Sequence, residues 1–278
     1  KNDVYVGIDK ELLRNKLFSI TAARIARELK LNRDTVERWY RDEIRAMPVY
    51  ALKYICNLTN TDPSKFEIKW IGGRGYPRNR LIPFLNSDLS YLIGLIVGDG
   101  HLYNNRIVIS GEEPFIKEIV VPHCQKIFPN MKIIARDMKD CFWAELNSRP
   151  LVWFVRDIFG IPIGKKTTTV RIPKIILASN KEIVYSFIGG LFDSDGSVSK
   201  RKRSSRLDFF TASDGLRDGI IGVFEEIGVG MSLYTDKRST HPVHRVSIST
   251  REKFKTFLEN IDFKHPRKKA ILMTLCSS

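Results

Sequence analysis

Two short stretches of the chain share one pattern, and this pattern constrains the fold more than any other feature. Residues 92–100 read LIGLIVGDG, and residues 188–196 read IGGLFDSDG. Each stretch is an apolar run with glycine at its third position, and each ends in an aspartate followed by glycine. Such a run predicts a buried helix whose glycine lets a second helix backbone approach closely. If the two helices pack side by side, Asp99 and Asp195 emerge together and can form a divalent-metal site.

The duplicated stretch resembles the LAGLIDADG motif of homing endonucleases, and the resemblance covers residues 86–270. The eighth motif position, which holds the metal-binding acid in that family, is Asp99 in one copy and Asp195 in the other. The sixth position, which varies more within the family, is Val97 in the first copy and Asp193 in the second.

The resemblance implies a chemistry as well as a fold. It implies that Asp99 and Asp195 are catalytic and bind Mg2+, with the carbonyl oxygens of Gly98 and Ser194 as further metal ligands. The implied reaction is a staggered cut in both strands of a long, asymmetric DNA site. Mn2+ is expected to replace Mg2+, and Ca2+ is expected to support binding without cleavage.

The segments that follow the two aspartates predict the same order of elements twice, in repeats that span residues 86–180 and 181–278. Each repeat has a motif helix, a hairpin, a helix, two strands and a closing helix. The predicted fold class is α+β, with tandem αββαββα repeats that are related by a pseudo-twofold axis and form a DNA-binding saddle. The second repeat is longer in its first hairpin, where residues 200–206 read KRKRSSR. A basic finger on one half only predicts an asymmetric target.

Residues 1–71 predict a separate all-α domain, and residues 72–85 predict a basic linker. Apolar residues spaced along one helix face precede a short turn and a second helix, which points Val36 and Trp39 inward. This order resembles the helix-turn-helix of phage repressors. On that interpretation three residues of the second helix reach DNA: Arg33, Thr35 and Arg38. The alternative is a plain helical bundle with charged faces in solvent.

The net charge of +15 indicates a polyanionic partner, most often nucleic acid. A β-ribbon fits the major groove of DNA, so basic residues on the predicted strands and turns are candidates for contacts with bases or phosphates. These candidates are Arg106, Arg136, Lys200, Lys202, Arg206, Lys237, Arg238 and Arg245. The alternative for each is a solvated strand residue.

Members of the family often carry a lysine near each aspartate that polarises the attacking water. Residues 147–148 and 249–250, at the ends of the last strands, are Asn-Ser and Ser-Thr instead. Lys202 is therefore the predicted catalytic lysine, and the other candidates are Lys200, Lys139 and Lys237.

Two functions other than DNA cleavage remain open on the sequence: an intron RNA maturase, and a regulator of the same fold that binds DNA without cutting it. Both aspartates are present, and this favours the enzyme. The chain ends lack the residues of protein splicing, which predicts an intron-encoded enzyme or a piece of something longer.

The four cysteines are scattered, which argues against a zinc site and favours a reducing intracellular compartment, the cytoplasm or an organelle. The apolar run near the first motif is too short to span a bilayer. Because both repeats lie in one chain, we expect a monomer.

Overall fold

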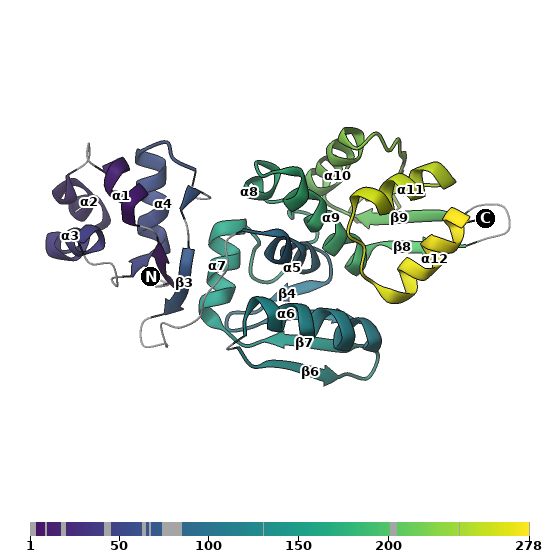
Figure 1. Cartoon of the computed structure of the whole chain (residues 1–278), viewed down its shortest axis with the longest axis horizontal. Helices are drawn as coiled ribbons and strands as arrows, with labels where there is room; N and C mark the ends of the chain where they lie inside the picture. Colours follow the sequence, from purple (N-terminus) through teal and green to yellow (C-terminus); the bar gives the residue numbers. More distant parts are fainter. Residues whose placement is uncertain are drawn as a thin grey trace.

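The structure is a computed structural model, and it describes residues 4–8, 10–17, 21–41, 46–62, 65–66, 68–73, 85–129, 131–200, 205–238 and 240–277. The described chain contains an N-terminal unit and two repeats that follow one another in sequence (Figure 1). None of the described helices combines the length and apolar character needed to cross a membrane.

The two repeats have the predicted αββαββα order, with an additional helix after each. The elements of the first repeat are α5 (Ser87–Val97), β4 (Gly100–Leu102), β5 (Ile107–Gly111), η2 (Phe115–Val120), α6 (Val121–Ile127), β6 (Ile133–Asp137), β7 (Phe142–Leu146), α7 (Arg149–Phe159) and α8 (Lys174–Leu177). Those of the second are α9 (Lys181–Asp195), β8 (Ser197–Ser199), β9 (Arg206–Thr211), α10 (Asp214–Glu226), β10 (Ser232–Asp236), β11 (Val243–Ile248), α11 (Arg251–Asn260) and α12 (Pro266–Ser277).

Corresponding helices of the two repeats begin with the same capping chemistry. The side chain of Asn86 accepts a hydrogen bond from the backbone N–H of Leu89 at the start of α5, and Asn180 accepts one from Ile183 at the start of α9. These contacts satisfy backbone N–H groups that have no partner inside the helix. Equivalent polar caps at the starts of two buried helices therefore fix where both motif helices begin.

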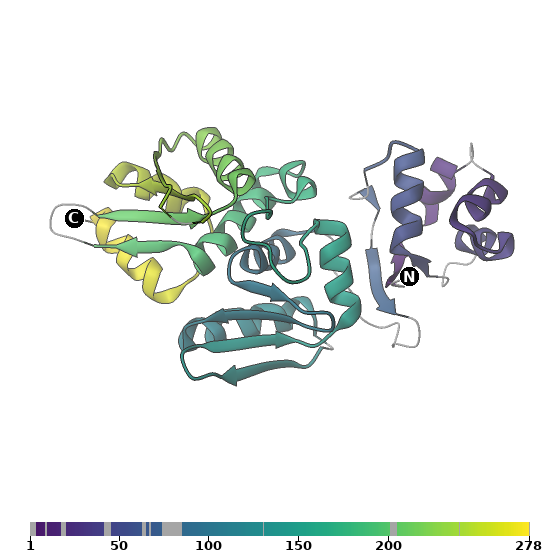
Figure 2. The ribbon, with the colours of Figure 1, turned by 180° about the vertical axis from the view of Figure 1, so that it is seen from behind.

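Each repeat forms a four-stranded antiparallel sheet, with strand orders β4-β5-β7-β6 and β8-β9-β11-β10. Alternate residues of a strand face opposite sides, so Ile107 and Ile109 enter the core while Val108 lies on the other face. The helices cover one face of each sheet, and the uncovered faces of both sheets are turned to the same side (Figure 2). Strands of both sheets therefore face one side of the molecule.

The two sheets are joined through α5 and α9, which pack backbone against backbone. A Cβ atom on Gly94 would lie 2.1 Å from the carbonyl oxygen of Phe187, and one on Gly190 would lie 2.0 Å from that of Tyr91. The hydroxyl of Ser90 also donates a hydrogen bond of 2.6 Å to the carbonyl of Ile183 across the same contact. The glycines at the third motif position therefore permit the close approach that the sequence predicts.

The helix that follows the first hairpin of repeat 1 has a π-helical first part, η2, before α6. The backbone N–H of Val121 bonds to the carbonyl of Ile116, five residues earlier, just ahead of Pro122. Because proline lacks an N–H and its ring crowds the carbonyl four residues before it, the wider π turn accommodates it.

The N-terminal unit is not all-α, and the prediction for residues 1–71 is wrong in this respect. It is a three-stranded sheet of order β2-β1-β3 covered by helices. The elements are β1 (Val4–Ile8), α1 (Lys10–Leu17), α2 (Ala22–Leu29), α3 (Arg33–Arg41), β2 (Met47–Pro48), α4 (Val49–Leu58) and β3 (Ile68–Gly73). The runs of β1 and β3 are rich in Val, Ile, Tyr and Trp, which favour strands.

The start of the predicted linker is also corrected, because Gly72 and Gly73 belong to β3 and pair with Tyr5 and Val4. Residues 74–84 of that linker lie outside the described residues. Strands β1 and β3 pack against α7, the helix of the first repeat that lies nearest the N-terminal unit (Figure 1).

The helix pair α2–α3 has the predicted order of a helix, a short turn and a second helix. Lys30 ends α2 in the left-handed conformation with a φ of 53°, and the side chain of Asn32 accepts a hydrogen bond from Asp34 at the start of α3. Val36 and Trp39 are buried, as predicted. Binding of DNA by α3 stays a prediction.

Replacement of Gly190 with alanine should test the helix contact. The added methyl group meets backbone that cannot move without separating α5 from α9, so we expect the free energy of unfolding to fall by about 3 kcal/mol. Urea-induced unfolding measures this change. Gly222→Ala in α10 is the matched control, because its Cβ would meet nothing within 4 Å. It should stabilise the protein by about 0.5–1 kcal/mol, and equal losses in both variants would contradict the tight contact.

Candidate active site

Asp99 and Asp195 lie together where the two motif helices end. Asp195 is the last residue of α9, and Asp99 follows the C-cap residue of α5, Gly98. Burial, the nearby charge of Asp99 and a hydrogen bond between the two carboxyl groups raise the pKa of Asp195 to about 7. A shift of this kind is typical of two like charges that share one small space. The sequence prediction that the aspartates meet is therefore consistent with the structure.

Two lysines that the sequence analysis did not choose lie at these helix ends. The Nζ atom of Lys166 donates hydrogen bonds of 2.5–2.6 Å to the last carbonyls of α5, those of Ile96, Val97 and Gly98. Nζ of Lys268 does the same at the end of α9, where it contacts the carbonyls of Asp193 at 2.7 Å and Ser194 at 2.8 Å, with Phe192 at 3.5 Å.

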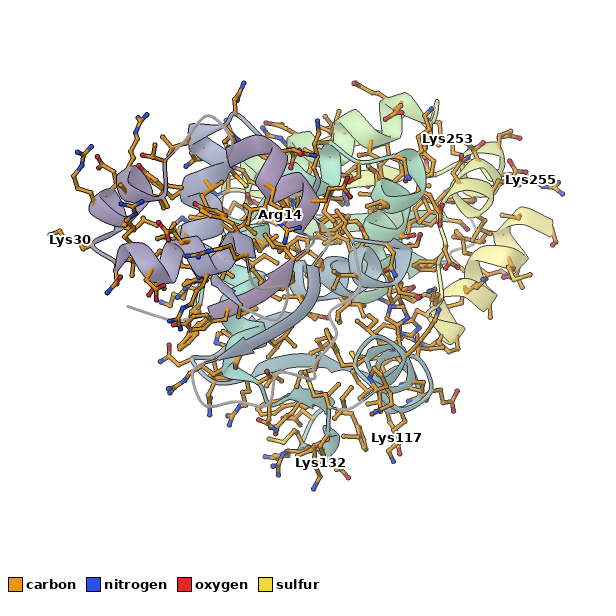
Figure 3. All side chains as sticks on the ribbon, turned by 60° about the vertical axis from the view of Figure 1, so that its left-hand side comes forward. Arg14, Lys30, Lys117, Lys132, Lys253 and Lys255 are labelled. Carbon is orange, nitrogen blue, oxygen red and sulfur yellow. The ribbon has the colours of Figure 1, made fainter. Side chains whose placement is uncertain are left out.

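Both lysines differ from the peripheral ones, such as Lys117 and Lys132, which point outward in Figure 3. Burial lowers the pKa of Lys166 to about 8, although the charges of Asp195 and Asp99 oppose this shift. Burial also lowers the pKa of Lys268. The two ammonium groups are thus held beside the aspartates although removing them from water costs free energy. Surface lysines stay hydrated and do not have this cost.

A signal for these lysines exists in the sequence. They lie 102 residues apart, the same interval that separates the matched ends of the two repeats at Leu146 and Ile248. Lys200 is exposed at the end of β8, and Lys202, the predicted catalytic lysine, lies outside the described residues. Lys166 and Lys268 are the two lysines that hydrogen-bond to the last carbonyls of the motif helices in the described part of the chain.

Asp193, at the sixth motif position, is fully buried and ties three parts of the fold together. Its carboxylate accepts hydrogen bonds from the Tyr91 hydroxyl at 2.7 Å and from the backbone N–H groups of Lys264 and His265 at 2.8 Å each. Burial nevertheless raises its pKa to about 6. Because these bonds hold the start of the segment that carries Lys268, Asp193 positions that lysine.

The donors at this point fit a hard divalent cation. The side chains are carboxylates, the adjoining backbone groups are carbonyl oxygens, and such oxygen sets bind Mg2+ and Ca2+. Within the described ranges no three His, Cys, Asp or Glu side chains gather as a metal-binding group. A cation held by Asp99 and Asp195 would therefore need carbonyl, water or phosphate oxygens to complete its coordination.

A cavity of about 610 Å3 opens beside Asp99. The loop that leads into η2, the turn between β6 and β7, and the start of α12 surround it. Its lining includes Lys139, one of the predicted substitute lysines, together with Asp193, Ser194 and Lys268. The space therefore extends from Asp99 to the turn between β6 and β7.

The uncovered face of the second sheet presents an arginine between two aromatic rings. Arg245 on β11 pairs in register with Phe210 on β9 and Tyr234 on β10. The Phe210 and Tyr234 side chains are 46% and 53% exposed, and the Arg245 guanidinium lies 5.3 Å from the Tyr234 ring. The Nε atom of Arg245 is buried, and within the described part of the chain it has no hydrogen-bond partner.

The uncovered face of the first sheet carries different side chains at the equivalent strand positions. Trp143 on β7 pairs with Ser110 and Arg136, and Arg136 forms an ion pair of 2.9 Å with the buried Glu145. Arg106 stacks on Tyr103 at 4.7 Å, and its Nε atom also has no partner among the described residues. The two faces thus differ in charge and apolar character although their backbones match.

The remaining predicted DNA contacts lie on α3 and at the ends of strands in the second sheet. Arg33 and Arg38 on α3 pair with Glu37 and Asp34, and Thr35 is partly buried on the same helix. Arg206 begins β9. Lys237 and Arg238 follow β10 and are exposed, and Arg238 pairs with Asp236.

Asp195→Asn should change how stability depends on pH. The folded metal-free protein keeps a proton on Asp195 up to about pH 7, whereas an ordinary aspartate releases it near 3.8. This contribution to stability is therefore present below pH 3.8 and is lost as the pH rises through about 7. In EDTA, we expect the Tm of the wild type to fall relative to that of the variant across this range. Asp140→Asn, at an exposed turn, should show a constant difference, and a constant difference for Asp195→Asn would contradict the shared proton.

Comparison with known proteins agrees with this geometry. The family model of the LAGLIDADG-like domain matches residues 182–262. The replication factor C small subunit of Methanocaldococcus jannaschii is 29% identical over 188 residues, which are 66% of this chain and 10% of that protein. The ribonucleoside-diphosphate reductase NrdEB subunit alpha of Bacillus subtilis is 24% identical over 214 residues, 64% of this chain and 19% of that protein. The chain therefore spans about a tenth to a fifth of these curated relatives.

Among solved structures, I-DmoI in complex with DNA and Ca has a TM-score of 0.51 and 22% identity, and the match covers 67% of this chain and 97% of that one. I-DmoI in complex with DNA and Mn has a TM-score of 0.50 and 22% identity, with 65% and 99% covered. This chain is therefore similar to the LAGLIDADG-like domain over residues 182–262, and it has the fold of I-DmoI.

Proposed function

We propose that this protein is a site-specific DNA endonuclease that makes a Mg2+-dependent, staggered cut in both strands of a long, asymmetric site. The observation that carries the proposal is the pairing of Asp99 and Asp195 at the ends of two packed helices, midway between two strand-lined faces. Two acids in one place suit a shared metal site, and two faces on one side suit a duplex that crosses it.

Binding of the duplex is assigned to the uncovered faces of the two sheets. Strands fit the major groove, where arginine is the commonest partner of guanine. Arg106 and Arg245 each keep a buried Nε without a partner among the described residues, and a DNA oxygen or nitrogen would satisfy it. Because the two faces carry different side chains, the two halves of the target should differ in sequence.

The chemistry is assigned to the helix ends. A divalent cation held there would supply a polarised water as nucleophile and would neutralise charge on the leaving oxygen. Asp99 and Asp195 would hold that cation, and the carbonyls of Gly98 and Ser194 would complete its protein ligands. Lys166 and Lys268 keep positive charge close to the position of the scissile phosphates, where negative charge develops.

The relatives support this assignment in two ways. I-DmoI has been crystallised with DNA together with Ca or Mn, which agrees with divalent-metal use by this fold. The curated relatives have unrelated names and share only a tenth to a fifth of their length with this chain. A segment found inside such different proteins is consistent with an inserted homing element rather than with their named activities.

Asp99→Asn and Asp195→Asn should separate binding from cleavage. A library of duplexes with long random sites is incubated with the protein in Ca2+, bound duplexes are recovered, and Mg2+ is then added before the new ends are sequenced. The wild type should yield staggered ends at one long site. The double variant, which loses both carboxylate ligands, should bind the same site and produce no ends, a loss of at least about 10³-fold in rate.

Specific binding by the wild type without new DNA ends in Mg2+ or Mn2+ would contradict the proposal that this protein is a DNA endonuclease. It would leave a DNA-binding regulator or, if intron RNA competes better than duplex, a maturase.

Substitutions on the two sheets should affect opposite halves of the target. Arg245→Ala should relax base preference in the half-site that the second sheet contacts, with a cost of about 1–3 kcal/mol per lost base contact. Arg136→Gln, which keeps a donor for Glu145, should relax only the other half. Sequencing of the bound pool for each variant measures both effects. Equal relaxation of both halves by either variant would contradict one face per half-site.

A further inference from the structure

The two motif helices end in an unusual way. The C-cap residues Gly98 and Gly196 have φ values of −70° and −68°, so neither helix closes with a left-handed glycine. The last carbonyls of a helix have no partner inside it and carry partial negative charge. In this protein Lys166 and Lys268 satisfy them, with one ammonium group against successive carbonyls of each helix.

The same ammonium groups hold the oxygens that the metal is expected to use. Nζ of Lys166 lies 2.5 Å from the Gly98 carbonyl, and Nζ of Lys268 lies 2.8 Å from the Ser194 carbonyl. A carbonyl oxygen has two lone pairs, but two cations on one oxygen repel each other strongly in a partly buried place. Metal and ammonium cannot both hold these oxygens at full strength.

We propose that Lys166 and Lys268 are resident cations of the metal site, which occupy the Gly98 and Ser194 carbonyls in the metal-free protein and compete with a divalent cation for them. The lysines keep the helix ends, and with them the two aspartates, in place without metal. They also raise the concentration of divalent cation at which the site is half occupied. The inference rests on the proposed metal site but is independent of DNA cleavage.

The geometry makes the two halves unequal. Lys166 contacts all three carbonyls at 2.5–2.6 Å, whereas Lys268 is 3.5 Å from the first of its three. Lys268 is also supported by Asp193, which holds the backbone of Lys264 and His265. Removal of Lys166 should therefore have the larger effect on metal affinity.

The test measures Ca2+ binding to the full chain without DNA, by calorimetry and by the rise of Tm with Ca2+ concentration. Lys166→Met removes the charge and keeps an unbranched apolar stem, and Lys166→Gln keeps a hydrogen-bond donor without charge. Lys165→Met, at the exposed neighbouring position, is the matched control. We expect both Lys166 variants to bind Ca2+ about 10-fold more tightly, while the Tm in EDTA falls, more for methionine than for glutamine.

If wild-type protein binds Ca2+ and neither Lys166 variant binds it more tightly than Lys165→Met does, the competition is refuted and the lysine is only a helix cap. Weaker Ca2+ binding in both Lys166 variants refutes it as well. If neither the wild type nor any variant binds Ca2+, the metal site of the proposed function fails together with the inference. The glutamine variant keeps the test decisive if the methionine variant does not fold.

Discussion

The contact between the backbones of α5 and α9 is the constraint on which the rest of the structure depends. At Gly94 and Gly190 the helices are so close that a single methyl group would overlap a carbonyl oxygen of the partner helix. Only at this spacing do the ends of the helices bring Asp99 and Asp195 within hydrogen-bonding reach of each other. The same contact fixes the two sheets, because each motif helix leads directly into the first strand of its sheet.

Bringing two carboxylates together creates an electrostatic cost, which the fold offsets locally. Burial and the like charge of Asp99 raise the pKa of Asp195, and the pair of carboxyl groups favours any cation that can approach. Lys166 and Lys268 supply such cations from segments that follow the last strands of each repeat, although burial disfavours their charged forms. Aspartates, carbonyls and ammonium groups therefore form one set of charges, and each of them would affect the binding of a metal ion at this point.

The sequence predicts the repeats well because their pattern is local. The apolar motif helices and the alternating strands each follow from residues near in sequence. The positions of Lys166 and Lys268 cannot be predicted from neighbouring residues, because these lysines reach the aspartates only through the tertiary fold. The N-terminal unit fails for a related reason: its helices have clear periodicity, whereas β1 and β3 are short and pair with each other across about 60 residues.

The two repeats differ at the ends of their motif helices, and the difference lies in how each helix end is held. Val97 is buried apolar surface at the end of α5, whereas its counterpart Asp193 accepts three hydrogen bonds that bind α9 to the opposite motif helix and to the segment before α12. The end of α5 is held by the short hydrogen bonds of Lys166. The end of α9 is held by Lys268 and by the hydrogen bonds of Asp193. Together with the different side chains on the two sheets, this asymmetry lets the halves differ in charge and hydrogen bonding while the helix contact keeps their backbones equivalent.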